Sequence, residues 1–153
     1  MQPHPKCVLL NFVKMKILIL FAMLAVQAHG QDGDSWKIKW NGEVLIEAKK
    51  EDPAANMKSA EIERQEDTPL LEIAYTESPP KKDWKRMIMI FGENSNELKR
   101  YDTANVVIGF DELKELIGEN KLIKIYTVSL PTDPELAAAV RVRRVHLGTI
   151  DFR

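Results

Sequence analysis

The residues most able to do chemistry gather near the carboxyl end of the chain. His146 stands close to three arginines, Arg141, Arg143 and Arg144. An imidazole beside guanidinium groups can bind an anion such as a carboxylate or a sulfated glycan. A strand row of exposed cations paired with acids on a neighbouring strand is the more common arrangement. Both interpretations stay open, and the first makes this segment a candidate anion-binding site.

A second basic cluster surrounds a tryptophan. Trp84 is followed by Lys85 and Arg86 and preceded by Lys81 and Lys82. An aromatic ring flanked by cations can stack on a sugar or contact an acidic partner. The alternative is a tryptophan that covers the end of a β-sandwich core. Trp84, Lys85 and Arg86 are therefore candidate binding residues, and the partner they suggest is a protein or a glycan.

Metal and nucleophilic chemistry find little support. His146 is the only histidine after residue 30, and the only cysteine, Cys7, lies before residue 30. This scarcity of histidine and cysteine ligands disfavours a transition-metal site. Residues 32–34 and 93–97 offer oxygen ligands without the spacing of an EF-hand loop. No Gly-x-Ser-x-Gly motif occurs, and nothing singles out a catalytic pair among the 23 acidic residues. We expect no catalytic residue, no metal and no cofactor.

An export signal precedes these residues. Lys14 and Lys16 supply positive charge, and residues 17–26 form an uninterrupted apolar run. Small residues follow, so we expect cleavage after Gly30 or, alternatively, after Ala28. Ten apolar residues rise about 15 Å as a helix, half the thickness of the hydrocarbon layer, which favours a cleaved signal over a transmembrane anchor.

Processing changes the chemistry of the remaining chain. We expect the signal to begin at Met15, the true start of translation. Removing residues 1–30 takes away Cys7 and three lysines. Residues 31–153 then carry 19 Lys and Arg against 23 Asp and Glu, a formal charge of −4. This excludes disulfides from the mature chain and gives no reason to expect nucleic-acid binding. We expect a single, monomeric domain in the periplasm or outside the cell.

The elements that position the candidate residues are mostly strands. Residues 36–40 alternate in polarity, and Asn41-Gly42 joins them to residues 44–48, the strongest hairpin signal in the chain. A two-residue loop would mix apolar and charged side chains on both faces. We therefore expect a three-residue loop, with Gly42 in a bulge and with Trp36, Ile38, Val44 and Ile46 on one buried face.

Turn residues separate the other expected elements. Residues 84–91 are apolar on both faces in their later half, which predicts a central strand. Asp111 and Asp133 are the expected caps of two short helices. The alternation breaks twice in 140–152, which predicts bulges near 143–144 and 148–149. The remaining expected strands are 70–76, 97–101, 105–110 and 121–130, with an edge strand around 60–64.

About seven to nine short strands with two helices predict a mostly β fold, an antiparallel β-sandwich that is immunoglobulin-like or related. Four segments, 83–86 (DWKR), 124–127 (KIYT), 130–134 (LPTDP) and 140–147 (VRVRRVHL), resemble small exported proteins of the Bacteroidota. The resemblance covers residues 35–152. It implies export to the periplasm or the cell surface, and it brings no assigned activity and no functional residues.

Three functions stay open. The first is an exported, non-catalytic binding domain, which an exposed tryptophan in a concave face would favour. The second is a structural or chaperone-like accessory of an envelope assembly, which a long, unprotected edge strand would favour. The third is a hydrolase, which would need His146 in a deep pocket with an acid and a serine.

Overall fold

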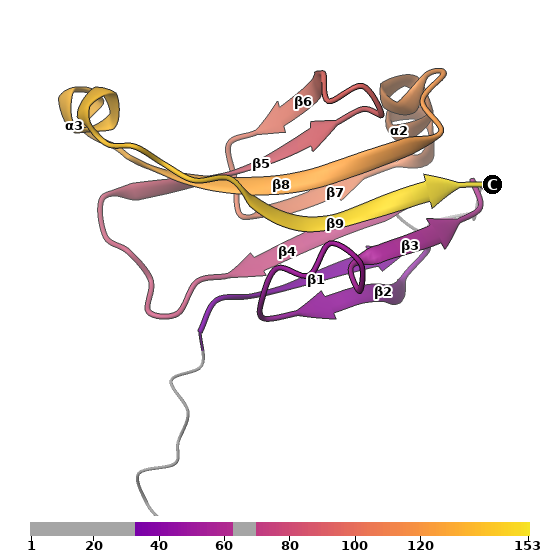
Figure 1. Cartoon of the computed structure of the whole chain (residues 1–153), viewed down its shortest axis with the longest axis horizontal. Helices are drawn as coiled ribbons and strands as arrows, with labels where there is room; N and C mark the ends of the chain where they lie inside the picture. Colours follow the sequence, from indigo (N-terminus) through magenta and orange to yellow (C-terminus); the bar gives the residue numbers. More distant parts are fainter. Residues whose placement is uncertain (1–32, 63–69) are drawn as a thin grey trace, which may run out of the picture. The chain divides into compact units, whose positions relative to one another are not determined.

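Nine strands in the described part of the chain form two sheets (Figure 1). The computed structural model describes residues 33–62 and 70–153, and Gly33–Arg153 form one compact unit. The expected signal peptide, its cleavage sites and the end of the edge strand expected at 60–64 lie outside the described residues. The elements are β1 (Ser35–Trp40), β2 (Glu43–Ala48), β3 (Met57–Ala60), β4 (Leu71–Thr76), β5 (Trp84–Phe91), β6 (Glu97–Tyr101), β7 (Asn105–Ile108), α2 (Phe110–Ile117), β8 (Leu122–Pro131), α3 (Pro134–Ala139) and β9 (Val145–Phe152).

The strands are ordered β2-β1-β4-β7 in the four-stranded sheet and β3-β9-β8-β5-β6 in the five-stranded sheet. All neighbours are antiparallel except β3, which runs parallel to β9 and starts three residues before the expected edge strand. The mostly β sandwich with two short helices is therefore confirmed. No helix within 33–62 and 70–153 is long and apolar enough to cross a membrane.

The main core lies between the sheets. Ile38 and Ile73 from one sheet and Ile88, Ile125 and Ile150 from the other are all fully or almost fully buried in one cluster. Each such side chain contributes about 1.5–3 kcal/mol relative to exposure in water. A buried hydrogen bond also joins the sheets, because the indole Nε1 of Trp36 in β1 donates to the Leu147 carbonyl of β9 at 2.8 Å.

The first hairpin differs from the expected one. The loop is the two-residue Asn41-Gly42, in which both residues have positive φ (50° and 80°), as a type I′ turn requires. The register shifts further along the hairpin, between Ile38 and Lys39, so that Ile38 still faces Ile46. Val44 thereby falls on the solvent side and is 52% exposed. A two-residue loop was expected to put apolar and charged side chains on the same face of the hairpin. The bulge inside the strand restores the separation of the two faces beyond it.

One of the two helix caps differs from the expected one. Gly109, in extended conformation, precedes α2, and Asp111 lies in the first helical turn instead of capping the helix. An acid is still favourable there because of the helix dipole. Asp133 caps α3 as expected: its Oδ1 accepts hydrogen bonds from the backbone N–H groups of Glu135 (2.9 Å) and Leu136 (3.4 Å).

The carboxyl-terminal strand is shorter than the broken alternation suggested. Residues 140–144, called the strap below, belong to no strand and lead from α3 to β9. The bulge expected at 143–144 is therefore the end of a loop. A register shift does occur in β9, opposite Ile125 and Tyr126 and between His146 and Gly148, close to the one expected at 148–149.

Candidate functional site

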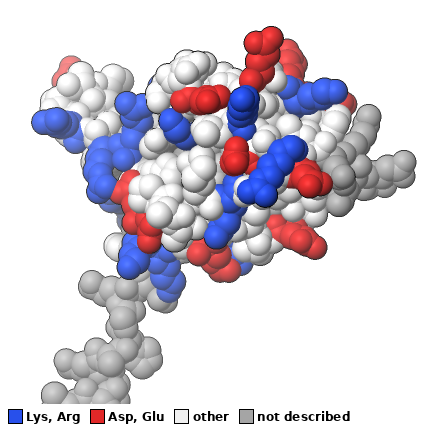
Figure 2. Space-filling model, turned by 45° about the vertical axis from the view of Figure 1, so that its right-hand side comes forward, with Lys and Arg blue, Asp and Glu red and all other residues white. Residues whose placement is uncertain are grey.

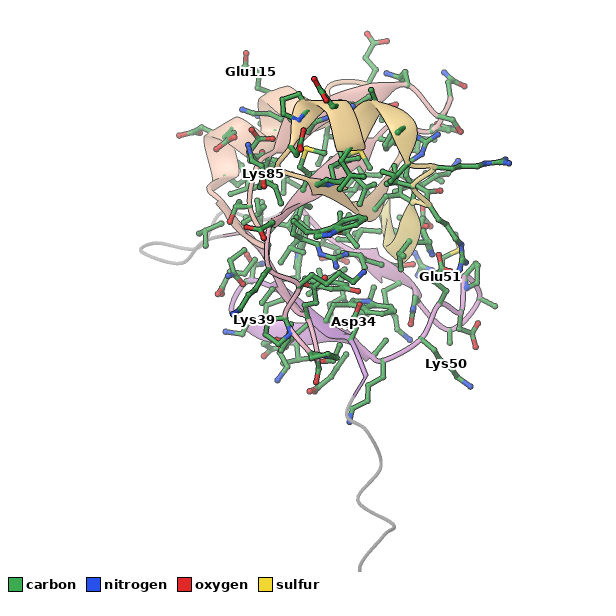
Figure 3. All side chains as sticks on the ribbon, turned by 90° about the vertical axis from the view of Figure 1, so that its left-hand side faces the viewer. Asp34, Lys39, Lys50, Glu51, Lys85 and Glu115 are labelled. Carbon is green, nitrogen blue, oxygen red and sulfur yellow. The ribbon has the colours of Figure 1, made fainter. Side chains whose placement is uncertain are left out.

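The two basic clusters expected from the sequence lie in different places. Lys85 and Glu51, the carboxylate partner of Arg143, are on opposite sides of the view in Figure 3. Acidic and basic side chains are interspersed on the face that Figure 2 shows. Charge is thus organised mainly in local pairs, and each candidate residue has to be judged by its own neighbours.

Arg86 is held inside the protein. Its guanidinium forms an ion pair with Glu77 and lies 4.2 Å from the centre of the Tyr75 ring. Its side chain is only 11% exposed. Stacking and pairing at such a site fix the guanidinium in one orientation. Arg86 therefore stabilises the junction between β4, the following turn and β5.

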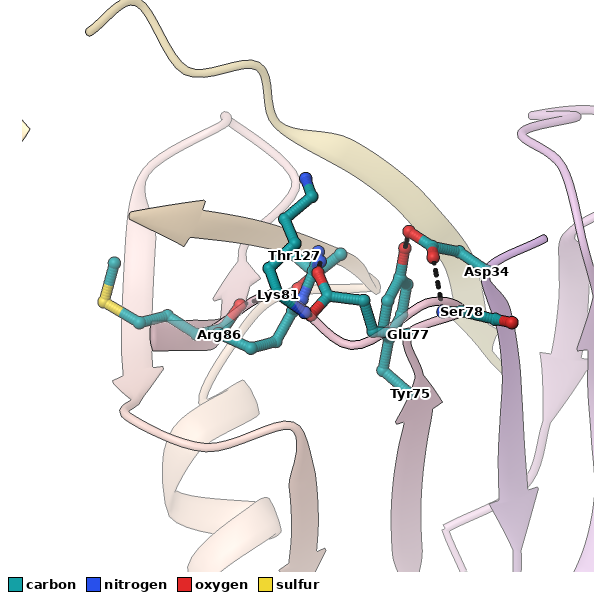
Figure 4. Close-up of polar contacts among 8 residues, drawn as sticks. Asp34, Tyr75, Glu77, Ser78, Lys81, Arg86 and Thr127 are labelled. Carbon is teal, nitrogen blue, oxygen red and sulfur yellow. Dashed lines mark hydrogen bonds and ion pairs between the residues drawn. The ribbon is translucent and has the colours of Figure 1, made fainter. Parts of the chain in front are cut away.

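Tyr75, next to Arg86, also holds the residue just before β1 in place (Figure 4). The Tyr75 hydroxyl donates to the Asp34 carboxylate at 2.6 Å, and the Ser78 backbone N–H donates to it at 3.0 Å. Burial opposes ionisation of Asp34, but these bonds and the nearby Arg86 outweigh it and lower its pKa. Burial, and then the bond to Asp34, raise the pKa of Tyr75. These groups hold β1 to the 77–78 turn, which is a structural role.

Trp84 and Lys85 stand at the start of β5. Trp84 is half-buried opposite Pro131, and the ammonium of Lys81 lies 5.2 Å from the centre of its ring. Lys85 pairs with Asp102 at the surface. Neither residue lines any of the three hollows described below. The other two tryptophans, Trp36 and Trp40, are core residues (3% and 8% exposed), and Trp36 was expected on a buried face.

His146 faces the outer side of the five-stranded sheet. Its ring is 5.2 Å from that of Tyr126 in an edge-on contact, and its Nε2 lies 3.0 Å from the Thr149 hydroxyl. Burial lowers the pKa of His146, and the Glu51 carboxylate opposes this only in part. Glu51 accepts hydrogen bonds from the His146 backbone N–H and from Arg143. The Glu51 carboxylate, between β2 and β3, thus holds both the end of the strap and the start of β9 in place.

Sequence reasoning missed a second apolar cluster on the outer face of the same sheet. Met87, Met89 and Phe91 of β5 and Val128 of β8 are buried there, with Tyr126 and Leu130 packed beside them. An antiparallel sheet with one solvated face would carry polar residues at these positions. The signal was present in β5, whose apolar residues occupy both faces after Arg86.

Two adjoining hollows lie over this cluster. The larger, about 400 Å³, has Met87, Met89, Val128 and Leu130 as its floor and Val142 of the strap as a wall; Glu97, Arg100 and Arg144 complete its lining. The smaller, about 330 Å³, is lined by Phe91, Ser95, Lys124, Tyr126 and Arg144. Arg144 belongs to both, so the two form one trough. Its aliphatic and methionine side chains line the larger hollow, Lys124 lines the smaller one, and Arg144 lines both.

The trough carries excess positive charge. Glu97 is engaged by Arg100 through two hydrogen bonds, of 2.9 and 2.7 Å, which lower the pKa of Glu97, with a smaller contribution from Arg144. Arg144 lies 5.2 Å from the centre of the Phe91 ring and, within the described part of the chain, has no carboxylate at ion-pair distance. Lys124 contacts only neutral oxygens, the Glu93 carbonyl (3.3 Å) and the Ser95 hydroxyl (3.5 Å). Within the described residues, neither Arg144 nor Lys124 has a carboxylate at ion-pair distance.

The opposite face offers less. A third hollow of about 200 Å³ lies over β1, β4 and β7, where Lys39 is already paired with Glu72. The described residues hold no group of three or more side chains that could bind a metal ion. Of the seven candidate residues, only Arg144 lines one of these three hollows. Arg141, exposed on the strap, lines none.

Comparisons with known proteins add no relative: no family model, no curated protein and no solved structure matches the chain.

Proposed function

We propose that residues 31–153 form an exported, non-catalytic binding domain whose ligand occupies the trough on the outer face of the five-stranded sheet. The observation that carries this proposal is the apolar floor beside Arg144 and Lys124, two cations with no carboxylate at ion-pair distance in the described residues. Apolar surface beside convergent polar groups is the usual composition of a binding site. Export is supported by the positive, apolar and small-residue order of residues 14–30.

The two alternatives have weaker support. A structural accessory that captures strands would need a long free edge, whereas the edge strands β2, β3, β6 and β7 have six, four, five and four residues. A hydrolase would need a nucleophile beside His146, whose ring Nε2 contacts Thr149, a residue only 9% exposed. In the described residues, the edge strands are thus too short for strand capture, and the surroundings of His146 lack the exposed nucleophile that a hydrolase requires.

Site-specific photo-crosslinking in the organism that encodes the protein tests the proposal. A photoreactive residue replaces Val142, at the wall of the trough, or Val107, which is 63% exposed on the opposite sheet and serves as the matched control. We expect a discrete adduct from position 142 and none from position 107. Absence of an adduct at 142, or equal adducts at both positions, would contradict the proposed function.

A further inference from the structure

The trough also indicates what kind of ligand it takes. Resting on the proposed function, we propose that its occupant is an extended peptide segment of a partner protein, about six residues long, with apolar side chains at one end and carboxylates at the other. The proposal depends on three features of the trough: the order of apolar and charged lining, its length, and the free backbone beside it.

The apolar end is shaped for side chains. Met87 and Met89 form its floor with Val128 and Leu130, and Val142 stands at its side with 37% of its surface exposed. Methionine side chains are flexible and polarisable, so they adapt to differently shaped apolar groups. This end therefore offers contact to apolar side chains, with Arg144 and the mutually paired Glu97 and Arg100 beside them.

The charged end favours carboxylates. Lys124 and Arg144 both line the smaller hollow, and neither has a carboxylate at ion-pair distance in the described residues. The only carboxylate in the trough, Glu97, is held by Arg100. A ligand carboxylate between Lys124 and Arg144 would gain charge-assisted hydrogen bonds, whereas a ligand cation would meet two like charges.

The length of the trough fits an extended chain. Alternate residues of β8, from Leu130 to Lys124, line it from the apolar end to the charged end. Six residue steps at about 3.3 Å make roughly 20 Å, the length of about six residues of extended peptide. Alternate side chains of such a peptide would point down to the floor and out to solvent.

The strap supplies backbone groups for pairing. Residues 141–143 are exposed and belong to no strand, and in the described part of the chain their N–H and C=O groups have no hydrogen-bond partner. The neighbouring bonds, from Val140 N–H to the Leu136 carbonyl and from His146 N–H to Glu51, fix the strap at both ends. A peptide in the trough can therefore pair with a segment that is already held in place, which lowers the entropic cost of binding.

Synthetic peptides test the assignment by NMR titration of the isotopically labelled, purified full chain. The probe is Leu-Thr-Leu-Thr-Asp-Asp, used also in reversed order because the direction of binding is not fixed. Controls are the same peptide with lysines in place of aspartates, and with serines in place of leucines. We expect one of the acidic leucine peptides to shift the amide signals of residues 124–130 and 142–144, and both controls to bind at least ~10-fold more weakly.

Variants locate the charge. Arg144→Ala and Lys124→Ala are each expected to weaken binding at least ~5-fold, the loss of about 1 kcal/mol for one charged contact. Arg141→Ala, on the same strap but outside both hollows, should leave the affinity unchanged. Unchanged amide spectra away from the substituted residue establish that each variant is folded.

Several results would overturn the assignment. They are binding of the lysine peptide as tight as that of the acidic one, shifts confined to other surfaces, and no shift for either acidic peptide at millimolar concentration. Tighter binding of dodecanoate, with the same pattern of shifts, would replace the peptide by a fatty acid. A crosslink at position 142 together with any of these results refutes the peptide and leaves the binding function standing, whereas loss of the crosslink refutes the function itself.

Discussion

Replacing Gly148 by alanine tests whether the close contact between β9 and the hairpin sets the packing of the core. A Cβ built on Gly148 would lie 2.5 Å from Cδ1 of Ile46 and 3.2 Å from both Cδ1 of Ile38 and the carbonyl oxygen of Asn56. Ordinary contacts between carbon atoms are about 3.5–4.0 Å, so the Ile46 side chain has to move by roughly 1 Å. Ile46 and Ile38 are 3% and 0% exposed, which leaves them no free space.

The magnitude follows from two opposing effects. Overpacking a core costs about 1–3 kcal/mol. Replacing glycine also restricts the unfolded chain, which stabilises the protein by about 0.4–1 kcal/mol. The Asn56 carbonyl cannot retreat freely because it accepts a hydrogen bond from the Thr149 N–H at 2.9 Å. We therefore expect Gly148→Ala to lower the free energy of unfolding by about 1–2 kcal/mol.

Urea unfolding followed by tryptophan fluorescence measures this change, because Trp36 and Trp40 are both in the core. The decisive variant is the double substitution Ile46→Val with Gly148→Ala, which removes the clashing Cδ1. Ile46→Val alone should cost about 0.5–1.5 kcal/mol. In the double variant we expect the two losses to be less than additive by at least ~0.5 kcal/mol. Strict additivity, or a Gly148→Ala protein as stable as the parent, would refute the reasoning.

Three further predictions concern other parts of the chain. Burial holds the pKa of His146 below its ordinary 6.5, so between the native and the unfolded pKa the native state binds fewer protons than the unfolded state. The free energy of unfolding should therefore fall as the pH is lowered through this window. In urea titrations between pH 5 and 7, His146→Gln should abolish this pH dependence, and an unchanged pH dependence in the variant would argue against the role of His146. Asp133→Ala, which removes the cap of α3, should cost about 0.5–2 kcal/mol if α3 unfolds with the domain; an unchanged midpoint in thermal melts would contradict this. Export of the tagged chain in a bacterial host should leave Gln31 or His29 as the first residue by mass spectrometry, and an intact amino terminus in the exported fraction would contradict the cleaved signal.

Periodicity predicted the strands well because the core between the sheets imposes it. Leu71, Ile73 and Tyr75 alternate along the strand expected at 70–76, and all three are buried. The bounds of β5 and β6 agree with the expected 84–91 and 97–101. Each of these segments has its polar turn residues at its ends, so local sequence and tertiary packing specify the same element.

The hairpin turn shows where local reasoning fails. Alternation alone ruled out the two-residue loop at Asn41-Gly42, since it would have placed Val44 on the wrong face. The chain accepts an exposed Val44 because the type I′ turn suits Asn and Gly, and a bulge one step later returns Ile46 to the core. The cost of one exposed valine is small beside that of a mismatched turn, a balance that pattern matching does not weigh.

The candidate site could not be predicted because it depends on contacts distant in sequence. Arg143 and Arg144 are adjacent, yet Arg143 pairs with Glu51 while Arg144 lies over Phe91 in the trough. Arg86 belongs to an apparently similar basic cluster and is consumed by Glu77 and Tyr75. Both clusters consist of closely spaced basic residues. Glu77 lies 9 residues from Arg86, whereas Glu51 lies 92 residues from Arg143, so distance along the chain does not tell which cation is held by a carboxylate.

The apolar residues on both faces of β5 are the strongest sequence trace of the trough. In a central strand of a sandwich they indicate that the outer face is covered as well as the inner one. Here the cover is a strap of five residues, rich in arginine, which shields Met87 and Met89 from water but leaves hollows beside them. The main core is covered differently, because α2 places the apolar side chains of Leu113 and Ile117 in it. A thin, charged strap over a methionine floor is better suited to sharing that face with a ligand.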